Sequence, residues 1–464
     1  MVPRARRRNR FLAVAQAPRS GRANVPLYAM RIFPQVRPMG IRRFAGWRCG
    51  GFPWGGIEIR RLAFMPRQDA IFILGASGTG LALLRDAVKL GFDAYVVDRH
   101  KGPAFDSRYG RKILDASADL SRTRALLREV SAERNCWLIA SSDTWLEFVQ
   151  AHRPWLEGLP VRILHPSARI VETCLSKIEF ARFCREQGFP TPLTWFVGAE
   201  ARPAGLELPL ILRPTRKLER NRPERPPLPK AREIRDEAEV ARWLDLYPEQ
   251  EGAFLLSHSL LGRDLVQLSV PFVRTQRECT MYVAEKIRPK PADCEVGIFV
   301  RIRPDAQAAA LAEQVITRLD YWGIGEVEIL RDRASGEYFL IEINPRPWSQ
   351  YSLSAWAGFH FLGTLTGRGK RRRGPPPTDG AWIDVAGDIY YFLFRRRTRD
   401  GRVDPTFIDY LRQLRSVRVL AHVDLLDPWP VLSATLRIGR RILGRRAGFA
   451  RRRRGAPGGS RGSV

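Results

Sequence analysis

The sequence has few cysteines, no long apolar run and almost no acid at its two ends. The six cysteines among 464 residues include no Cys-x-x-Cys pair and follow no regular spacing. This pattern argues against a disulfide framework and a zinc site, and it is typical of a reducing cytoplasm. No apolar run approaches the length of about eighteen residues that spans a bilayer. The sequence therefore predicts a cytoplasmic protein without a transmembrane segment.

The formal charge of +30 lies mostly at the two ends of the chain. Residues 1–64 carry fourteen Arg and one Glu, and residues 434–464 carry ten Arg and no acid, which leaves +7 for the residues between. The excess charge is therefore separate from the central chemistry, and no specific nucleic-acid partner is predicted. We expect both ends to be disordered. A basic nucleic-acid arm at the N-terminus and a basic amphipathic helix on an anionic membrane at the C-terminus are the alternative interpretations.

The length and the 44% hydrophobic content allow a large core and two to four domains. The first ordered segment reads as a strand, Ala70–Leu74, then a Gly-rich turn, Gly75–Gly80, a helix and a second strand that ends at Asp98. By itself this βαβ pattern favours a dinucleotide site. A third strand ends just before Asp143, which we expect to cap the helix starting at Thr144, with contact to a small substrate as the alternative.

Residues 325–348 predict an acidic β-hairpin. Two runs with period-two alternation, Glu326–Leu330 and Tyr338–Asn344, flank a link that ends in Ser335-Gly336. Alternation assigns the apolar side chains of both runs to one buried face. These are Val327, Ile329, Phe339, Ile341 and Ile343.

The opposite face of this hairpin carries the candidate metal ligands Glu328, Glu342 and Asn344. Glu328 lies almost opposite Glu342, and two like charges across a ladder destabilise it by up to ~1 kcal/mol, so we expect a cation between them. Mg²⁺ fits because it takes one or two carboxylates together with substrate phosphates. Arg346 follows Pro345 at a position from which it can reach phosphate oxygens on the same metal. A solvent-facing hairpin with ordinary surface charges is the alternative.

The sequence Glu342-Ile-Asn-Pro-Arg346, preceded by Val327-Glu328, resembles the metal-binding strands of the ATP-grasp superfamily, in particular the carboxylate–amine ligases related to D-alanine–D-alanine ligase and the carbamoyl phosphate synthase large subunit. Matching segments run from about Ile71 to Phe361. The resemblance implies an α/β and α+β fold, with a Rossmann-like pre-ATP-grasp domain before a two-subdomain ATP-grasp fold and disordered basic ends. The implied boundaries are a leader at 1–64, the pre-ATP-grasp domain at 65–165, the ATP-grasp domain at 166–366 and a C-terminal extension with a basic tail at 367–464.

The resemblance also implies site residues. Mg²⁺ or Mn²⁺ would bind Glu328, Glu342 and Asn344, and the catalytic cations would be Arg288 and Arg346. The ATP contacts would be Lys177, Arg213, Lys230, Ser257, His258 and Asp264. Three features depart from the family pattern: Arg213 replaces a Lys, His258 stands where a Glu is usual, and a Pro- and Arg-rich loop at 215–232 replaces a small lid.

The implied activity is that of an enzyme, an ATP-dependent ligase that activates a small-molecule carboxylate as an acyl phosphate and joins it to an amine or a thiol. Its partners would be the carboxylate and amine substrates, and a homodimer is allowed. Two other functions stay open. A degenerate ATP-grasp protein would bind nucleotide without ligating, in line with Arg213 and the altered hinge. An NAD(P)-dependent oxidoreductase would use the Gly75 turn and Asp98.

Overall fold

The computed structural model describes residues 68–216, 227–247, 253–289, 297–369, 375–394, 406–434 and 436. The residues of these ranges belong to one compact unit. The predicted disordered leader at 1–64, the Arg-rich tail after 436 and the centre of the predicted lid, 217–226, lie outside the described residues. Within the described ranges, no helix combines the length and the apolar character needed to cross a bilayer.

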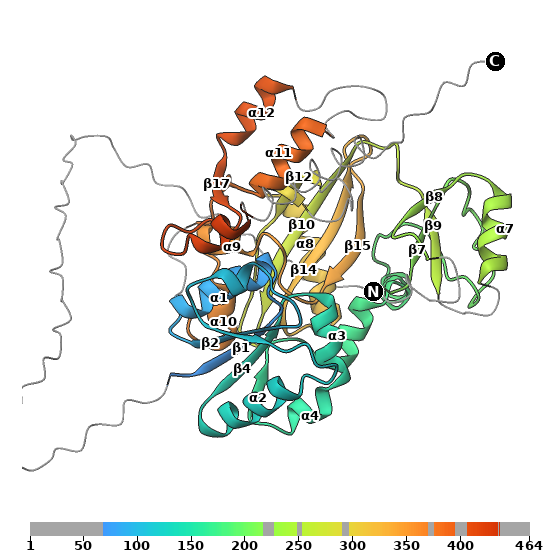
Figure 1. Cartoon of the computed structure of the whole chain (residues 1–464). Coiled ribbons are helices and arrows are strands. Elements are labelled where there is room, and N and C mark those ends of the chain that lie inside the picture. The colour runs from blue at the N-terminus through green and yellow to red at the C-terminus, as the bar shows by residue number, and fades with distance from the viewer. Residues whose placement is uncertain are drawn as a thin grey trace, which may run out of the picture. The chain divides into compact units, whose positions relative to one another are not determined.

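The N-terminal part forms a parallel sheet with helices around it (Figure 1). Its strand order is β3-β2-β1-β4-β5, and the first and fourth strands are buried at every residue, as expected where both faces of a parallel sheet are covered. The strands are β1 (Ala70–Leu74), β2 (Asp93–Asp98), β3 (Arg111–Leu114), β4 (Cys136–Ala140) and β5 (Val161–Ile163). The helices are α1 (Gly78–Lys89), η1 (Pro103–Asp106), α2 (Ser121–Glu133), α3 (Asp143–Ala151) and α4 (Arg153–Glu157).

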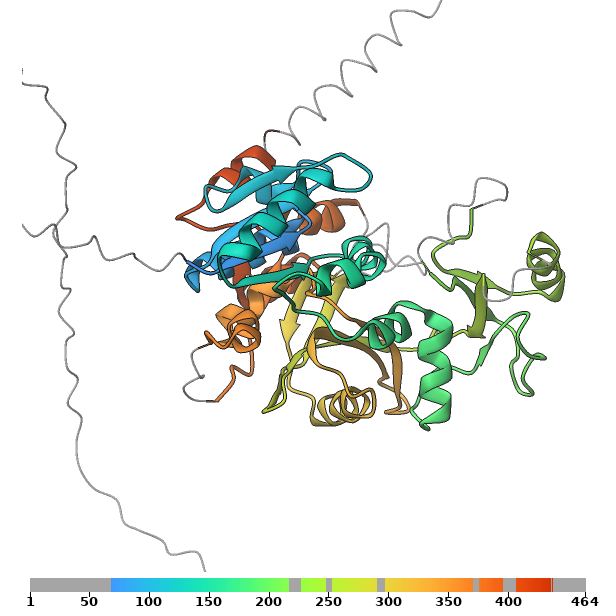
Figure 2. The same ribbon diagram turned by 90° about the horizontal axis from the view of Figure 1, so that it is seen from below.

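Two helices and a small antiparallel sheet follow. In α6 (Lys177–Glu186), which comes after α5 (Ala168–Leu175), Ser176 accepts a hydrogen bond from the Glu179 N–H, and Gly188 just beyond the end has a φ of 71°. This confirms the predicted helix stop. The sheet order is β6-β9-β7-β8, and α7 (Glu237–Leu246) packs against it (Figure 2). Its strands are β6 (Thr194–Trp195), β7 (Leu210–Pro214), β8 (Arg232–Ile234) and β9 (Phe254–His258).

The largest sheet in the described ranges has the order β15-β14-β10-β12-β13-β16-β17, with β11 paired to β10. Its last two strands come from the predicted C-terminal extension, so that segment completes the sheet. The strands are β10 (Leu265–Arg274), β11 (Cys279–Met281), β12 (Ala284–Pro289), β13 (Gly297–Ile302), β14 (Gly323–Asp332), β15 (Tyr338–Asn344), β16 (Ala381–Ile383) and β17 (Val417–Leu420). The helices are α8 (Ala306–Arg318), α9 (Tyr351–Trp356), α10 (Phe361–Thr366), α11 (Val385–Phe394) and α12 (Phe407–Leu414). Helices α9 and α10 contact α1 of the first part (Figure 1). The mixed α/β and α+β fold class is confirmed.

The predicted hairpin is present, but its buried face differs from the prediction at two positions. Val327, Ile329 and Ile343 are buried as expected, whereas Leu340 is fully buried and Phe339 and Ile341 are not. The cause is a register shift, because Glu328 pairs with Glu342 and the next residue, Ile329, pairs with Leu340. An extra residue in one strand of a ladder reverses the alternation beyond it. The prediction for Phe339 and Ile341 was therefore wrong.

Candidate functional site

The two glutamates of the hairpin face each other in the structure, and this confirms their predicted register. They line a cavity of about 130 Å³ that is surrounded by charged side chains. Five predicted site residues share this cavity: Lys177, Glu328, Glu342, Asn344 and Arg346. Lys286, Glu326 and Gln350, which we did not predict as site residues, line it as well, and so does Asp143, for which contact with a small substrate was the alternative interpretation.

Two lysines contact the opposed carboxylates. The Lys286 Nζ lies 2.6 Å from Glu328 Oε1, and the Lys177 Nζ lies 3.5 Å from Glu342 Oε2. Burial raises the pKa of Glu328 to about 7, although Lys286 opposes this. Burial also acts to raise the pKa of Glu342, but Lys177, Arg213 and Lys286 hold that pKa below its usual value. The two carboxylates are thus held close together by positive charge on both sides.

A hydrogen-bond network fixes the neighbouring acid and amide. Glu326 accepts from the Ser269 hydroxyl at 2.5 Å and from the Gln350 amide at 3.1 Å. The Asn344 amide donates to Glu326 Oε2 at 3.3 Å and to Glu328 Oε1 at 3.1 Å. Glu326 lies two residues from Glu328 on the same strand, so simple alternation was a sequence signal that could have identified it.

Arg346 joins this site to the parallel sheet. Its guanidinium forms an ion pair with Asp143, donates to Asp143 Oδ2 at 3.2 Å and contacts Asn344 Oδ1 at 3.2 Å. The cap of α3 is Ser142, whose side chain accepts from the Trp145 N–H, so the prediction that Asp143 caps this helix was wrong. Because the residue before it takes the capping role, the Asp143 carboxylate is directed toward Arg346.

Arg213 lies close enough to Glu342 for each to shift the pKa of the other, and its side chain has a hydrogen-bond donor without a partner among the described residues. Burial lowers the pKa of Arg213, while Glu342 acts to raise it. The buried Nε of Arg213 and the buried hydroxyl of Thr215 have no hydrogen-bond partner among the described residues. Buried donors without partners are costly, and a bound anion would satisfy them.

Arg288 lies outside this cavity. It pairs with Asp388 at 2.5 Å and contacts Gln413, while Phe299 lies under its guanidinium. A register shift in β12 between Lys286 and Arg288 explains the difference, since strict alternation would put both residues on one face. The cation that this strand supplies to the site is Lys286.

The remaining predicted ATP contacts lie on or near the small sheet and do not line the cavity. Ser257 and His258 belong to β9, which pairs with β7, the strand that carries Arg213. Lys230 is half-buried just before β8. Asp264 lies before β10, where its largely exposed carboxylate pairs with Arg333 at 3.2 Å.

The Gly-rich turn after the first strand is hydrogen-bonded to Asp98 of the same chain. Asp98 Oδ2 accepts a hydrogen bond from the Ala76 N–H at 2.6 Å, and its other oxygen accepts from the His100 N–H at 3.2 Å. A Cβ on Gly80 would lie 2.0 Å from the Gly75 carbonyl oxygen, so glycine is required there for close packing. A nucleotide ribose would have to compete with the Ala76 N–H for Asp98.

The donor set of the cavity fits a hard divalent cation. In the described ranges, no three His, Cys, Asp or Glu side chains form a ready-made metal site. The two opposed carboxylates and the Asn344 amide instead offer the partial set of oxygen ligands that Mg²⁺ takes when substrate phosphates complete its coordination. Arg213, which interacts with Glu342 although it does not line the cavity, has a buried donor that lacks a partner in the part of the chain that the structure describes, and an anion would satisfy it.

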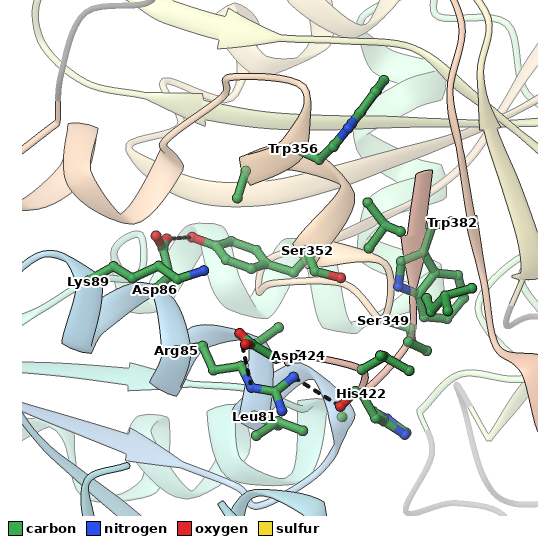
Figure 3. A pocket seen from close by; sticks show the side chains of 18 of the residues that line it. Leu81, Arg85, Asp86, Lys89, Ser349, Ser352, Trp356, Trp382, His422 and Asp424 are labelled. Carbon is green, nitrogen blue, oxygen red and sulfur yellow. Dashed lines mark hydrogen bonds and ion pairs between the residues drawn. The ribbon is translucent and has the colours of Figure 1, made fainter. Parts of the chain in front are cut away.

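A second cavity of about 650 Å³ lies against the first, and Ser349 lines both. Its walls come from α1, from α9 and from residues 419–424, which are the end of β17 and the segment that follows it. Figure 3 shows Trp356 and Trp382 on one side of this space and Asp86 with Lys89 toward another. The Tyr351 hydroxyl donates to Asp86 at 2.7 Å, and Arg85 donates to the His422 carbonyl at 3.1 Å. This cavity is large enough for a small organic molecule.

No protein-family model and no curated protein matches the sequence. Solved structures do match. An ADP complex of purK, an N5-carboxyaminoimidazole ribonucleotide synthetase, matches with a TM-score of 0.55 and 14% identity over 75% of this chain and 96% of that chain. The corresponding synthetase from Thermus thermophilus matches with a TM-score of 0.52 and 20% identity over 67% and 82%. A biotin carboxylase–ATP complex from Campylobacter jejuni matches with a TM-score of 0.50 and 14% identity over 66% and 72%. At these identities the likeness establishes a shared fold.

Proposed function

Because the chain has the fold of the ATP-grasp ligases, we propose that it is an ATP-dependent ligase that joins a small-molecule carboxylate to an amine or a thiol. The observation that carries this proposal is the pair of opposed carboxylates, Glu328 and Glu342, with cationic side chains around them. Such a cluster can hold a cation and the phosphate tail of a nucleotide in one place.

Glu328, Glu342 and Asn344 would hold Mg²⁺ or Mn²⁺ together with phosphate oxygens. When bound, the ion supplies positive charge that offsets the negative charge of the phosphates. Lys177, Lys286, Arg213 and Arg346 supply the protein's own positive charge, which stabilises the transferring phosphoryl group. Asp143 orients Arg346 through their ion pair.

The reaction needs no nucleophile from the protein. An oxygen of the substrate carboxylate attacks the γ-phosphorus of ATP, and ADP leaves with the electrons of the broken bond. The nitrogen of the amine then attacks the carbonyl carbon of the acyl phosphate, phosphate leaves, and the nitrogen loses a proton to give the amide. The chain's task is to align the reactants and to exclude water, which would hydrolyse the acyl phosphate.

We assign the amine or carboxylate substrate to the second cavity, because Ser349 lines both this cavity and the one that holds the opposed carboxylates. Its Trp356 and Trp382 walls favour a substrate with an apolar or aromatic body. Of its basic side chains, Arg85 is already paired with Asp427, and Arg368 with Asp69.

A second candidate is a nucleotide-binding protein without ligase activity. The Lys286 ammonium at 2.6 Å from Glu328 favours it, since this lysine already neutralises one of the two carboxylates without a metal ion. Arg213 in place of the usual Lys points the same way. The two candidates differ in one measurable respect, which is the release of ADP in the presence of a carboxylate and an amine.

The substitution Glu342→Gln tests the proposal. We expect wild-type protein to be stabilised against heat by ATP with Mg²⁺ and to release ADP with some members of a panel of carboxylates and amines. The variant should lose at least about a hundredfold in the ADP release rate, because one ligand and one charge of the site are gone. Glu337→Gln, at the exposed turn of the same hairpin, is the matched control and should behave as wild type.

Three outcomes separate the candidates. Stabilisation by ATP with Mg²⁺ and no ADP release with any pair supports the nucleotide-binding protein. Stabilisation by reduced nicotinamide nucleotides and not by ATP supports the oxidoreductase. If Glu342→Gln responds to ATP with Mg²⁺ as wild type does, the opposed carboxylates do not hold the nucleotide, and the proposal fails.

A further inference from the structure

Five large apolar side chains gather on the surface within a short stretch near the C-terminal end of the described chain. Leu425 is 93% exposed, Leu426 66%, Trp429 58%, Leu432 49% and Leu436 64%. Together we call these five residues the docking face. Single exposed apolar residues are ordinary, but five large ones within twelve residues of the chain indicate a surface that a partner covers.

The segment that carries the docking face is fixed to the rest of the fold by the hydrogen bonds of Asp427. Asp427 is fully buried between the exposed leucines and Trp429, and it accepts hydrogen bonds from Arg85 Nε at 3.0 Å, from the Ser107 hydroxyl at 2.7 Å and from the Arg108 N–H at 2.8 Å. The Leu426 N–H also bonds to Asp424 Oδ1 at 2.9 Å. These contacts fix the backbone to α1 and to the segment after η1, so Leu425 and Leu426 project outward from a fixed support.

The second half of the docking face is helical. Residues 429–434 and 436 are helical, and the Leu432 N–H bonds to the Pro428 carbonyl at 3.2 Å. Trp429, Leu432 and Leu436 are spaced by three and four residues, so they lie on one side of this helix. The two exposed leucines, Leu425 and Leu426, lie in the turn just before the start of this helix.

The charge of the sequence next to the docking face favours an anionic partner. The two acids of the segment, Asp424 and Asp427, are both turned toward Arg85. The residues that follow, 437–464, contain ten Arg and no Asp or Glu. An apolar surface followed directly by such a basic sequence combines the two attractions that hold peripheral proteins on anionic lipid, which are apolar insertion and phosphate contact.

We propose that the docking face inserts into the surface layer of an anionic lipid bilayer and anchors the protein there peripherally. Lipid suits this surface better than a protein partner does, because Leu425 projects almost completely free of the fold. The acyl layer accepts such a projection without a complementary pocket. Tryptophan is also a side chain favoured at the membrane interface. This inference is independent of the proposed ligase activity.

The full-length chain is tested by co-sedimentation with vesicles of phosphatidylcholine alone and of phosphatidylcholine mixed with phosphatidylglycerol. We expect binding to the mixed vesicles, weaker binding to the neutral ones and a loss of affinity as salt is raised. The double variant Leu425→Ser/Leu426→Ser should bind the mixed vesicles at least about tenfold more weakly, because apolar insertion is lost. Leu261→Ser, at a residue 52% exposed between β9 and β10, is the matched control and should bind as wild type.

Three results would overturn the proposal. Equal binding to both kinds of vesicle removes the role of anionic lipid. Unchanged binding of the double variant shows that the arginines act without the docking face. Light scattering that finds an oligomer in wild type and a monomer in the double variant, with no vesicle binding by either, shows that the face joins copies of the chain. Unfolding midpoints equal to wild type verify that the variants are folded, as expected for substitutions at exposed positions.

Discussion

The Lys286 ammonium stabilises the negative charge of the buried Glu328 carboxylate in the folded protein. Both side chains are buried, and Glu326 and Glu342 add further negative charge to the environment of Glu328. A buried ion pair is a weak source of stability, but the removal of one partner leaves the other charge without compensation in a poorly solvated place. Lys286 therefore contributes most to the free energy of unfolding when no metal ion is bound.

We predict that Lys286→Met lowers the free energy of unfolding by about 3 kcal/mol in the absence of divalent cations. Addition of Mg²⁺ should recover part of this loss, because the ion compensates the same carboxylates. Urea denaturation with and without Mg²⁺ measures both effects.

Arg333→Met is the control for this comparison. It breaks the two ion pairs of the half-exposed Arg333, with Asp264 and with Glu285, and should cost less than about 1 kcal/mol with no dependence on Mg²⁺. Equal losses for the two variants would show that the buried pair carries no special role.

At the scale of the elements, two irregular strands decide which side chains reach the site. In β15 the shift between Leu340 and Glu342 turns Leu340 into the core, and in β12 the shift between Lys286 and Arg288 turns Arg288 away from the cavity. A bulge of this kind changes the face of every residue beyond it. The same strand therefore supplies one cation to the cavity and another to the contact with α11 and α12.

We predict that Arg288→Met destabilises the fold without changing nucleotide affinity. Among the described residues, the variant leaves the fully buried Asp388 carboxylate with only the Tyr410 hydroxyl, at 2.8 Å, as a side-chain partner, so the free energy of unfolding should fall by about 3 kcal/mol. Binding of a fluorescent ATP analogue with Mg²⁺, measured where both proteins are folded, should be the same as in wild type. Weaker binding of the analogue would instead place Arg288 at the phosphates.

At the scale of the whole molecule, His165 connects the parallel sheet to Pro345, the residue after the candidate metal ligand Asn344. Its Nε2 accepts a hydrogen bond from the Ala140 N–H at 2.7 Å at the end of β4, and its Nδ1 lies 3.1 Å from the Pro345 carbonyl. The neutral ring makes both contacts when Nδ1 carries the proton. Burial lowers the pKa of His165 to about 4, with the Pro345 carbonyl opposing and Arg153 reinforcing this shift.

This pKa predicts a pH dependence of stability. Between pH 6.5 and about 4 the unfolded chain binds a proton at this histidine and the folded chain does not, so the free energy of unfolding falls as the pH is lowered through that window. The contribution amounts to about 3 kcal/mol at full size. His165→Gln should lack it, whereas His100→Gln at the exposed surface should retain it. Unfolding by urea at a series of pH values measures the difference, because all other groups titrate in both proteins. Parallel pH profiles for wild type and His165→Gln would contradict the assignment.

The sequence by itself determined the features that depend on near neighbours. The Glu328 and Glu342 pairing follows from the alternation of two strands and the length of one turn, and the ends of α6 follow from Ser176 and Gly188. These patterns are readable because hydrogen bonds between close residues fix them.

Only the tertiary structure decided which distant charges meet. Asp143 lies 203 residues from Arg346 in the chain, and Arg85 lies 342 residues from Asp427. The choice of Lys286 over Arg288 depended on a bulge that the alternation of side chains does not reveal. Long-range pairs and bulges arise from the packing of whole strands and helices, and no local pattern of residue types specifies them.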